Sequence, residues 1–148
     1  MFQSLFDSST VPLLQKVAAF TERRHEVLTG NIANISTPDY KTRDLPVAEF
    51  QKSLQDAISR RQTPNRPAGD NWAFATSVAQ PAFASLSRPQ LYQAIEAPQT
   101  GVTFQDGNNR SIEIEVMEMT KNQLMQSVAI ELMNSQLGRI QAVVSERP

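Results

Sequence analysis

Apolar residues recur at helical spacing near the N-terminus. From Thr10 to about Ile35 they step alternately by four and three positions, which predicts an amphipathic helix. Thr10 is the expected N-cap, and Pro12 falls in the first turn, where its missing N–H costs little. The predicted seam consists of Leu14, Ala18, Thr21, His25, Leu28, Ile32 and Ile35, widened on one side by Leu13, Val17, Phe20 and Val27.

A second, longer helix is predicted from about Ser111 to about Ser145. Ser111 is the expected N-cap, and Glu113 and Glu115 suit the positive end of the helix dipole. At ~1.5 Å per residue this helix is roughly 50 Å long, which is ordinary for a coiled coil. Its apolar residues form two sets, first Ile114, Met117, Leu124 and Val128, then Ile130, Met133, Leu137, Ile140 and Val144. Neither terminal helix buries its stripe alone, so we predict that they pair as a coiled-coil domain.

The middle of the chain changes character. A shorter helix is predicted from Asp44 to Arg60, with Pro46 near its start and one face formed by Val47, Phe50, Leu54 and Ile58. Residues 62–110 carry five of the nine prolines and no sustained periodicity. We interpret them as a flexible or irregular Pro-rich insert, in which a small satellite cluster or short hairpin would use Trp72, Phe74, Phe83, Leu86, Leu91 and Tyr92.

The pattern therefore predicts an all-α fold in four segments. Residues 1–9 form a disordered N-terminal segment, and 10–60 hold the first helix, a turn and the short helix. Residues 61–110 are the insert, and 111–148 hold the last helix, which pairs with the first.

Charge and composition exclude several classes of function. The net charge of −1 provides no basic field for nucleic acid or an anionic membrane. The chain has no cysteine and one histidine, so thiol catalysis, Cys-ligated metal and multi-His metal sites are excluded. No stretch reaches the ~20 apolar residues of a membrane span, and the N-terminus lacks the features of a cleavable secretion signal. We expect no catalytic, cofactor or metal site, no nucleic-acid partner and no direct membrane span.

The end of the first helix has an unusual sequence, LTGNIANISTPDYKTRD over residues 28–44. Pro38 biases the preceding residue away from the α region, so the helix must end near Ile35. Ser36, Thr37 and Asp39 supply side-chain oxygens for a turn. The amides of two poor helix formers, Asn31 and Asn34, either bridge to a neighbouring chain or tie the exiting loop to the helix.

Two stretches carry a resemblance to a known family. The sequence N-I-A-N-x-x-T-P-x-Y-K, from Asn31 to Lys41, resembles the N-terminal signature of bacterial flagellar rod, hook and related axial proteins. The stretch DGNNRSIEIEVMEMTKNQLMQSVAIELMNSQL resembles the matching terminal helix of the proximal rod family, FlgB. The short chain and the run Arg43-Asp44-Leu45 also favour this family. Where the family usually has Gly, this chain has Asp39, one of the few non-Gly residue types that tolerates a left-handed conformation.

The resemblance implies a structural subunit of the flagellar basal body proximal rod. Such a subunit polymerises through its terminal helices as part of the drive shaft for motility, and it is exported without a cleavable signal into the periplasm-spanning rod. The implied partners are copies of itself, other rod proteins, the basal-body adaptor FliE and the flagellar type III export apparatus. The predicted assembly interface is Leu28, Asn31, Ile32, Asn34, Thr37, Pro38, Tyr40, Leu124, Val128, Met133, Leu137 and Ile140.

Two other classes of function were weighed. A small enzyme needs converging polar groups, and His25 has no patterned partner, so we interpret it as a packing or solvated residue. A helical adaptor or chaperone of the export and assembly system remains the alternative.

We interpret the four methionines of the last helix as adaptable packing residues. We interpret the acidic residues Glu113, Glu115 and Glu118 as a solvated helix start.

Overall fold

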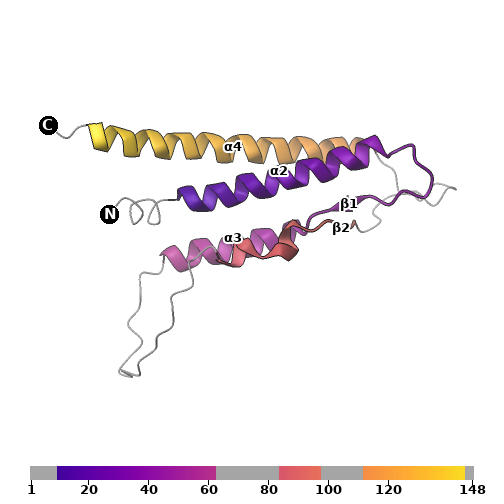
Figure 1. Cartoon of the computed structure of the whole chain (residues 1–148), viewed down its shortest axis with the longest axis horizontal. Helices are drawn as coiled ribbons and strands as arrows, with labels where there is room; N and C mark the ends of the chain where they lie inside the picture. The colour runs from indigo at the N-terminus through magenta and orange to yellow at the C-terminus, as the bar shows by residue number, and fades with distance from the viewer. Residues whose placement is uncertain (1–9, 63–83, 98–111, 146–148) are drawn as a thin grey trace, which may run out of the picture.

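The computed structural model describes residues 10–62, 84–97 and 112–145. Three long elements dominate these residues: α2 (Val11–Ala33), α3 (Val47–Gln62) and α4 (Ile112–Ser145). Two single 3₁₀ turns, η1 (Ala84–Ser87) and η2 (Pro89–Tyr92), and a ribbon of β1 (Arg43–Asp44) and β2 (Ile95–Glu96) complete the order. The predicted all-α fold with long terminal helices is confirmed (Figure 1).

Helix α2 begins where the sequence predicts. The N–H groups of Leu13 and Leu14 both donate to the Thr10 carbonyl at 3.1 Å, and Pro12 lies in the first turn. Thr10 thus occupies the N-cap position, although its side chain makes no capping hydrogen bond. The helix ends at Ala33, and the N–H of the C-cap residue Asn34 donates to the Gly30 carbonyl at 3.1 Å.

Helix α2 lies between the other two helices, with α4 along one side and α3 on the other (Figure 1). Helices α2 and α4 run antiparallel and form the most extensive contact of the described residues. On the α3 side, the Phe20 ring stacks on Phe50 with centroids 3.8 Å apart. The core around this pair also contains Leu13, Val17, Leu45, Ala57, Leu86, Leu91 and Ala129.

Because α2 has two neighbours, its buried face is wider than the predicted seam and rotated from it. Phe20 and Val17, which the pattern placed at the margin, are buried, whereas His25 is exposed. Placing His25 on the seam was therefore wrong, and the interpretation of His25 as solvated is confirmed. Arg24 is buried instead, with 8% of its surface exposed. The buried residues of α2 are Val11, Leu13, Val17, Phe20, Thr21, Arg24, Leu28 and Asn31.

Helix α4 packs on α2 through small and polar side chains. Asn122 and Ala129 are buried at 2% and 3% exposure, and Met125 packs against the core. The predicted seam of the first apolar set was wrong, since these residues are not buried against α2 and are 41% to 67% exposed: Ile114, Met117, Leu124 and Val128. Small side chains allow two helix backbones to approach closely, and this closeness lets Asn122 hydrogen-bond to α2.

The second apolar set of α4 has a mixed environment. Met133 and Ile140 are half-buried, whereas Ile130 and Leu137 are both 41% exposed. This half of the predicted seam lies partly against the rest of the chain.

Helix α3 starts three residues later than predicted. Asp44 lies in β1, and the N–H of Phe50 donates to the Pro46 carbonyl at 3.0 Å as the helix begins. Along α3, Phe50 is buried, Val47 and Leu54 pack against the core, and Ile58 is 37% exposed.

The described part of the predicted insert joins the main core. Leu86 and Leu91 are buried there, and Tyr92 packs against the same core. These three residues therefore do not form a separate satellite cluster. Strand β2 pairs antiparallel with β1, Arg43 opposite Glu96 and Asp44 opposite Ile95, rather than within the insert. Trp72, Phe74, Phe83, the 1–9 segment and the Ser111 cap lie outside the described residues.

Candidate assembly surface

The side chain of Asn31 joins three segments of the chain. Its amide nitrogen donates to the Arg43 carbonyl at 2.7 Å and to the Glu115 carboxylate at 3.0 Å. Its amide oxygen accepts from the Arg43 N–H at 3.1 Å and the Tyr40 hydroxyl at 3.2 Å. Asn31 is 1% exposed, so its amide lies in the interior, while the four hydrogen bonds to its partners are partly buried. Of the two uses predicted for this amide, the structure shows the second, because it ties the exiting loop to the helix.

The turn after α2 is held by its own side chains. Asn34 Nδ2 donates to the Gly30 carbonyl at 2.9 Å, and the Thr37 N–H donates to the Asn34 carbonyl at 2.9 Å. Asp39 has φ 57°, the left-handed conformation expected where the family has Gly. The turn reverses the chain so that Tyr40 and Arg43 return to Asn31.

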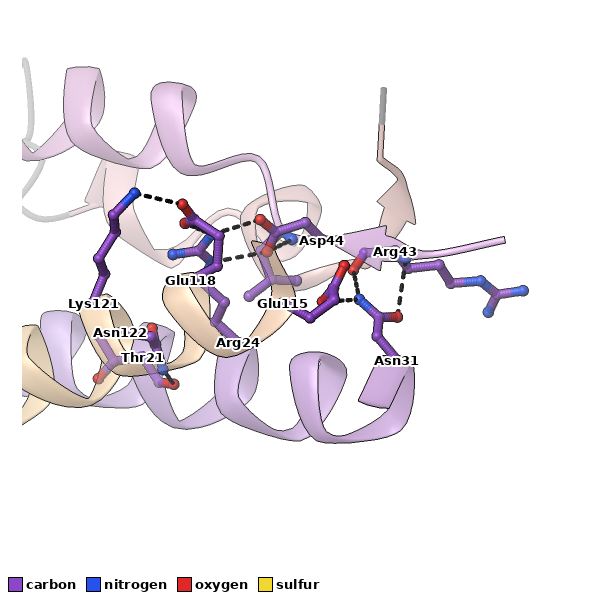
Figure 2. A network of polar contacts seen from close by, with 10 residues as sticks. Thr21, Arg24, Asn31, Arg43, Asp44, Glu115, Glu118, Lys121 and Asn122 are labelled. Atoms are coloured by element: carbon purple, nitrogen blue, oxygen red, sulfur yellow. Dashed lines mark hydrogen bonds and ion pairs between the residues drawn. The ribbon is translucent and has the colours of Figure 1, made fainter. Parts of the chain in front are cut away.

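Arg24 makes a second connection between the same three segments. Its Nε and Nη2 donate to the two carboxylate oxygens of Asp44 at 2.8 and 2.6 Å. Nη2 also donates to Glu118 at 2.9 Å, and Figure 2 shows the guanidinium between these two carboxylates. The planar fork of arginine suits such two-point binding, which a lysine ammonium cannot reproduce. We call Arg24, Asn31, Asp44, Glu115 and Glu118 the polar lock.

The polar lock changes the acidity of its members in opposite directions. Burial raises the pKa of Glu115, an effect that the hydrogen bond from Asn31 only partly offsets and that the charge of Asp44 reinforces. The pKa of Glu118 is lowered, first by the hydrogen bond from Lys121 and then by Arg24, against the effect of burial. For Arg24, burial opposes the charged form, but the two carboxylates outweigh it and the pKa is raised. Interpreting Glu115 and Glu118 as a solvated helix start was therefore wrong.

One further polar contact fixes the register of the two terminal helices. Asn122 Nδ2 donates to the Thr21 carbonyl at 2.8 Å in a buried position (Figure 2). The Thr21 hydroxyl in turn donates to the carbonyls of Val17 and Ala18. A one-residue slip would leave a buried amide without its acceptor, which is costly. The α2–α4 pair is thus specified by polar groups as well as by packing.

The outer face of α4 is apolar. The first apolar set lies there, and Leu124 is the most exposed of its members at 67%. Leu132 and Val143 are exposed as well. Large apolar side chains gathered on one exposed face are a mark of interaction sites on soluble proteins. We call the surface formed by Ile114, Met117, Leu124 and Val128 the outer stripe.

The structure separates the predicted interface residues into two groups. Leu28 and Asn31 are buried within the chain, and Ile32, Asn34, Tyr40, Met133 and Ile140 are half-buried. The exposed ones are Thr37, Pro38, Leu124, Val128 and Leu137. A common role of all the predicted interface residues in assembly remains a prediction. The buried ones can contribute to it only by keeping the exposed ones in position.

Sequence reasoning missed Arg24, Glu118 and Asn122. A signal for Arg24 existed, because it continues the spacing of Val17, Phe20 and Leu28 and so occupies a core position. A charged residue at such a position requires partners, but the sequence gives no sign of which carboxylates those are.

The side chains of the polar lock have a structural role. Among the described residues, no group of three His, Cys, Asp or Glu side chains is placed to hold a metal ion. The helices described here include none with the length and apolar character needed to cross a membrane. The guanidinium of the polar lock forms ion pairs with its carboxylates. The fold and the lock therefore define an all-α protein with an exposed apolar helix face.

Comparison with known proteins agrees with this class. No family model matches the chain. It is similar to the flagellar basal body rod protein FlgB of Bacillus subtilis (28% identity over 142 residues, 96% of this chain and 97% of the relative). It is also similar to FlgB of Aeromonas hydrophila (29%, 90% and 91% coverage) and of Aquifex aeolicus (29%, 93% and 94% coverage). The resemblance seen in the sequence is confirmed: over most of its length the chain is similar to FlgB flagellar basal body rod proteins, which are structural proteins and not enzymes.

Proposed function

We propose that this chain is a subunit of the proximal rod, which polymerises through its terminal helices as part of the drive shaft for flagellum-dependent motility. The observation that carries the proposal is the outer stripe. The 34-residue helix α4 packs on its own chain through Asn122 and Ala129. The large apolar side chains of the outer stripe are therefore available for contact with another molecule. Burying such side chains contributes ~25 cal/mol per Å² of apolar surface, which favours association.

The polar lock supports the same proposal from inside the subunit. A rod transmits torque, so each subunit needs a fixed angle between its terminal helices and the loop that joins them. Arg24 and Asn31 hold that angle through interactions with Asp44, Glu115 and Glu118. In this proposal the buried residues of the predicted interface keep the exposed ones in position.

The proposed partners follow from the family. Copies of this chain and other rod proteins would cover the outer stripe, and FliE and the flagellar type III export apparatus would meet the subunit at the base of the rod. The location would be the periplasm-spanning rod of the basal body.

Charged substitutions on the outer stripe test the proposal. Leu124→Asp and Val128→Asp change side chains that are 67% and 47% exposed, so the isolated chain should fold as before. If the stripe is covered in the rod, an unpaired charge there costs several kcal/mol, and cells that depend on the variant should produce the protein but not swim. The control is Glu131→Gln on the same helix, where the side chain is exposed. Normal swimming by both stripe variants would overturn the proposal.

A further inference from the structure

The start of α4, the β-ribbon and the start of α3 enclose an open groove of about 740 Å³. Its apolar lining includes Ile95, Ile114 and Met117, which are 53%, 41% and 47% exposed. Large apolar side chains gathered around a groove and left in contact with water indicate a docking site rather than a core. A small polar ligand is disfavoured, because Arg24 is already held by Asp44 and Glu118.

The groove is also acidic. Five carboxylates line it, those of Asp44, Glu49, Glu96, Glu115 and Glu118, against the two guanidinium groups of Arg24 and Arg43. The five negative and two positive charges leave −3 on the lining itself, and Lys41 and Lys121, which pair with Glu96 and Glu118 from outside it, reduce this to −1. A partner segment that combines apolar side chains with positive charge would complement it.

The opposite end of α4 has these properties. Thr21 lies opposite Asn122 in the antiparallel pair, so Val11, ten residues earlier, lies opposite about Leu132. Residues 134–145 of α4 therefore extend beyond the first residue of α2, as Figure 1 shows. This overhang bears Leu137, Ile140 and Val143, and its one charged residue is Arg139.

Among the described residues, two positions of the overhang are open to a close neighbour. Val143 is 71% exposed, and a Cβ added at Gly138 would meet nothing within 4 Å among the described residues. Glycine within a helix costs roughly 1 kcal/mol relative to alanine, and a backbone that another segment approaches closely would offset that cost.

We propose that the overhang of one copy, residues 134–145, docks into the acidic apolar groove of a second copy. The groove and the overhang lie at opposite ends of the same helix, so the contact is head-to-tail. A heterologous contact of this kind repeats along an axis instead of closing on itself, which is how an open filament forms. The inference rests on the proposed self-assembly and specifies a second contact, which shares Ile114 and Met117 with the outer stripe but lies in the groove at the start of α4.

Cysteine cross-linking of the full-length protein tests the contact, because the chain contains no cysteine. Met117→Cys lies in the groove and Val143→Cys lies on the overhang. Within one chain they are 26 helical residues apart, ~39 Å, so they cannot form an intramolecular disulfide. Mixing the two single variants under mild oxidation should give a cross-linked heterodimer, and docking should raise its yield about tenfold over an undocked pair by raising the local thiol concentration.

Leu124→Cys is the matched control, because it lies one heptad beyond Met117 on the same helix face and outside the groove. A Met117–Val143 yield well above the Leu124–Val143 yield supports the inference. Equal yields, or dimers from Met117→Cys alone, overturn it. If Leu124→Cys instead links to itself while the groove pair does not, only the groove inference fails and lateral assembly through the outer stripe stands.

Charge reversal provides an independent check. Arg139→Glu on the overhang should lower the cross-linking yield several-fold at low salt, since it meets an acidic groove. Glu49→Lys with Glu96→Lys on the groove chain should restore the yield with the reversed overhang. No effect of Arg139→Glu on the yield would overturn the charge complementarity on which the choice of occupant rests.

Discussion

The guanidinium of Arg24 holds the carboxylate of Asp44 by two hydrogen bonds, of 2.8 and 2.6 Å, across 20 residues of chain. This pair fastens the loop after α2 to the middle of α2 itself, and Glu118 adds α4 to the same guanidinium. The side chain of Arg24 is 9% exposed, whereas those of Asp44 and Glu118 are 26% and 29% exposed. The arginine is thus desolvated, and its neutralisation depends on both partners.

We expect Arg24→Ala to lower the free energy of unfolding by about 2 to 4 kcal/mol, less than for a fully buried pair because the carboxylates remain partly solvated. Arg24→Lys should recover only part of the loss, since an ammonium cannot bind both oxygens of Asp44 in parallel. The neighbouring Arg23→Ala is the control, because Arg23 is exposed and its pair with Glu26 is worth ~0.5 kcal/mol or less. Urea denaturation of the monomer measures all three, and equal losses for Arg23 and Arg24 would contradict the lock.

The two asparagines of the helix end should differ in their contributions. Asn31→Ala removes four partly buried hydrogen bonds and leaves the Arg43 carbonyl without its amide donor, so we expect a loss of about 2 to 4 kcal/mol. Asn34→Ala removes mainly the bond to the Gly30 carbonyl from a half-buried position and should cost ~1 kcal/mol. Thermal unfolding followed by circular dichroism compares them. A larger loss for Asn34 than for Asn31 would show that Asn31 is not the hub.

Position 39 should accept glycine and reject β-branched residues. With φ at 57°, Asp39→Val is expected to destabilise the protein by about 1 to 2 kcal/mol, because Cβ crowds the following carbonyl in the left-handed region. Asp39→Gly should be neutral within ~1 kcal/mol, since glycine adopts this conformation without steric cost but gains entropy when unfolded. If valine and glycine variants unfolded at the same denaturant concentration, the left-handed turn would be ruled out.

Glu115 and Glu118 should give opposite dependences on pH. The folded-state pKa of Glu115 is raised, so its contribution is complete below the unfolded pKa of about 4.3 and is lost as the pH rises through the folded pKa. Glu115→Gln keeps an oxygen acceptor for Asn31 and should therefore be more stable than the parent at neutral pH, with the gain vanishing in acid. The folded-state pKa of Glu118 is lowered, so Glu118→Gln should lose stability at neutral pH, and the loss should fade as the pH falls through that folded pKa.

Unfolding free energies of the two variants and the parent between pH 3 and 7 would test this pair of signs. Changes of the same sign in both variants at neutral pH would contradict the assignment, because both substitutions remove one negative charge from the same helix turn.

Hydrogen exchange should follow the register of the α2–α4 pair. In a verified monomer, amides near Thr21 and Asn122 should exchange slowly, since both residues are buried and joined by a hydrogen bond. Amides of residues 134–145 should exchange much faster, because this part of α4 extends beyond α2. Mass spectrometry of peptic peptides resolves the two regions, and uniform protection along α4 would contradict the gradient.

The sequence alone determined the elements and the resemblance to FlgB proteins. The start of α2 followed from Thr10 and Pro12, its end from Pro38, and the left-handed turn from Asp39 in a place where glycine is usual. These are local effects, since capping, proline sterics and backbone conformation act over a few residues. The motif at Asn31–Lys41 and the terminal helix together sufficed to show this resemblance, because both lie in stretches whose local patterns are distinctive.

Only the tertiary structure decided which face of each helix is buried. Periodicity places apolar residues on a common face, but it assigns no partner to that face, and the outer stripe looked like a seam for this reason. The true α4 contact uses Asn122 and Ala129, whose size and hydrogen bonding are favourable only when α2 lies close by. Likewise, no sequence spacing links Arg24 to Asp44 and Glu118, since the energy of a buried charge depends on which groups the fold brings to it from 20 and 94 residues away.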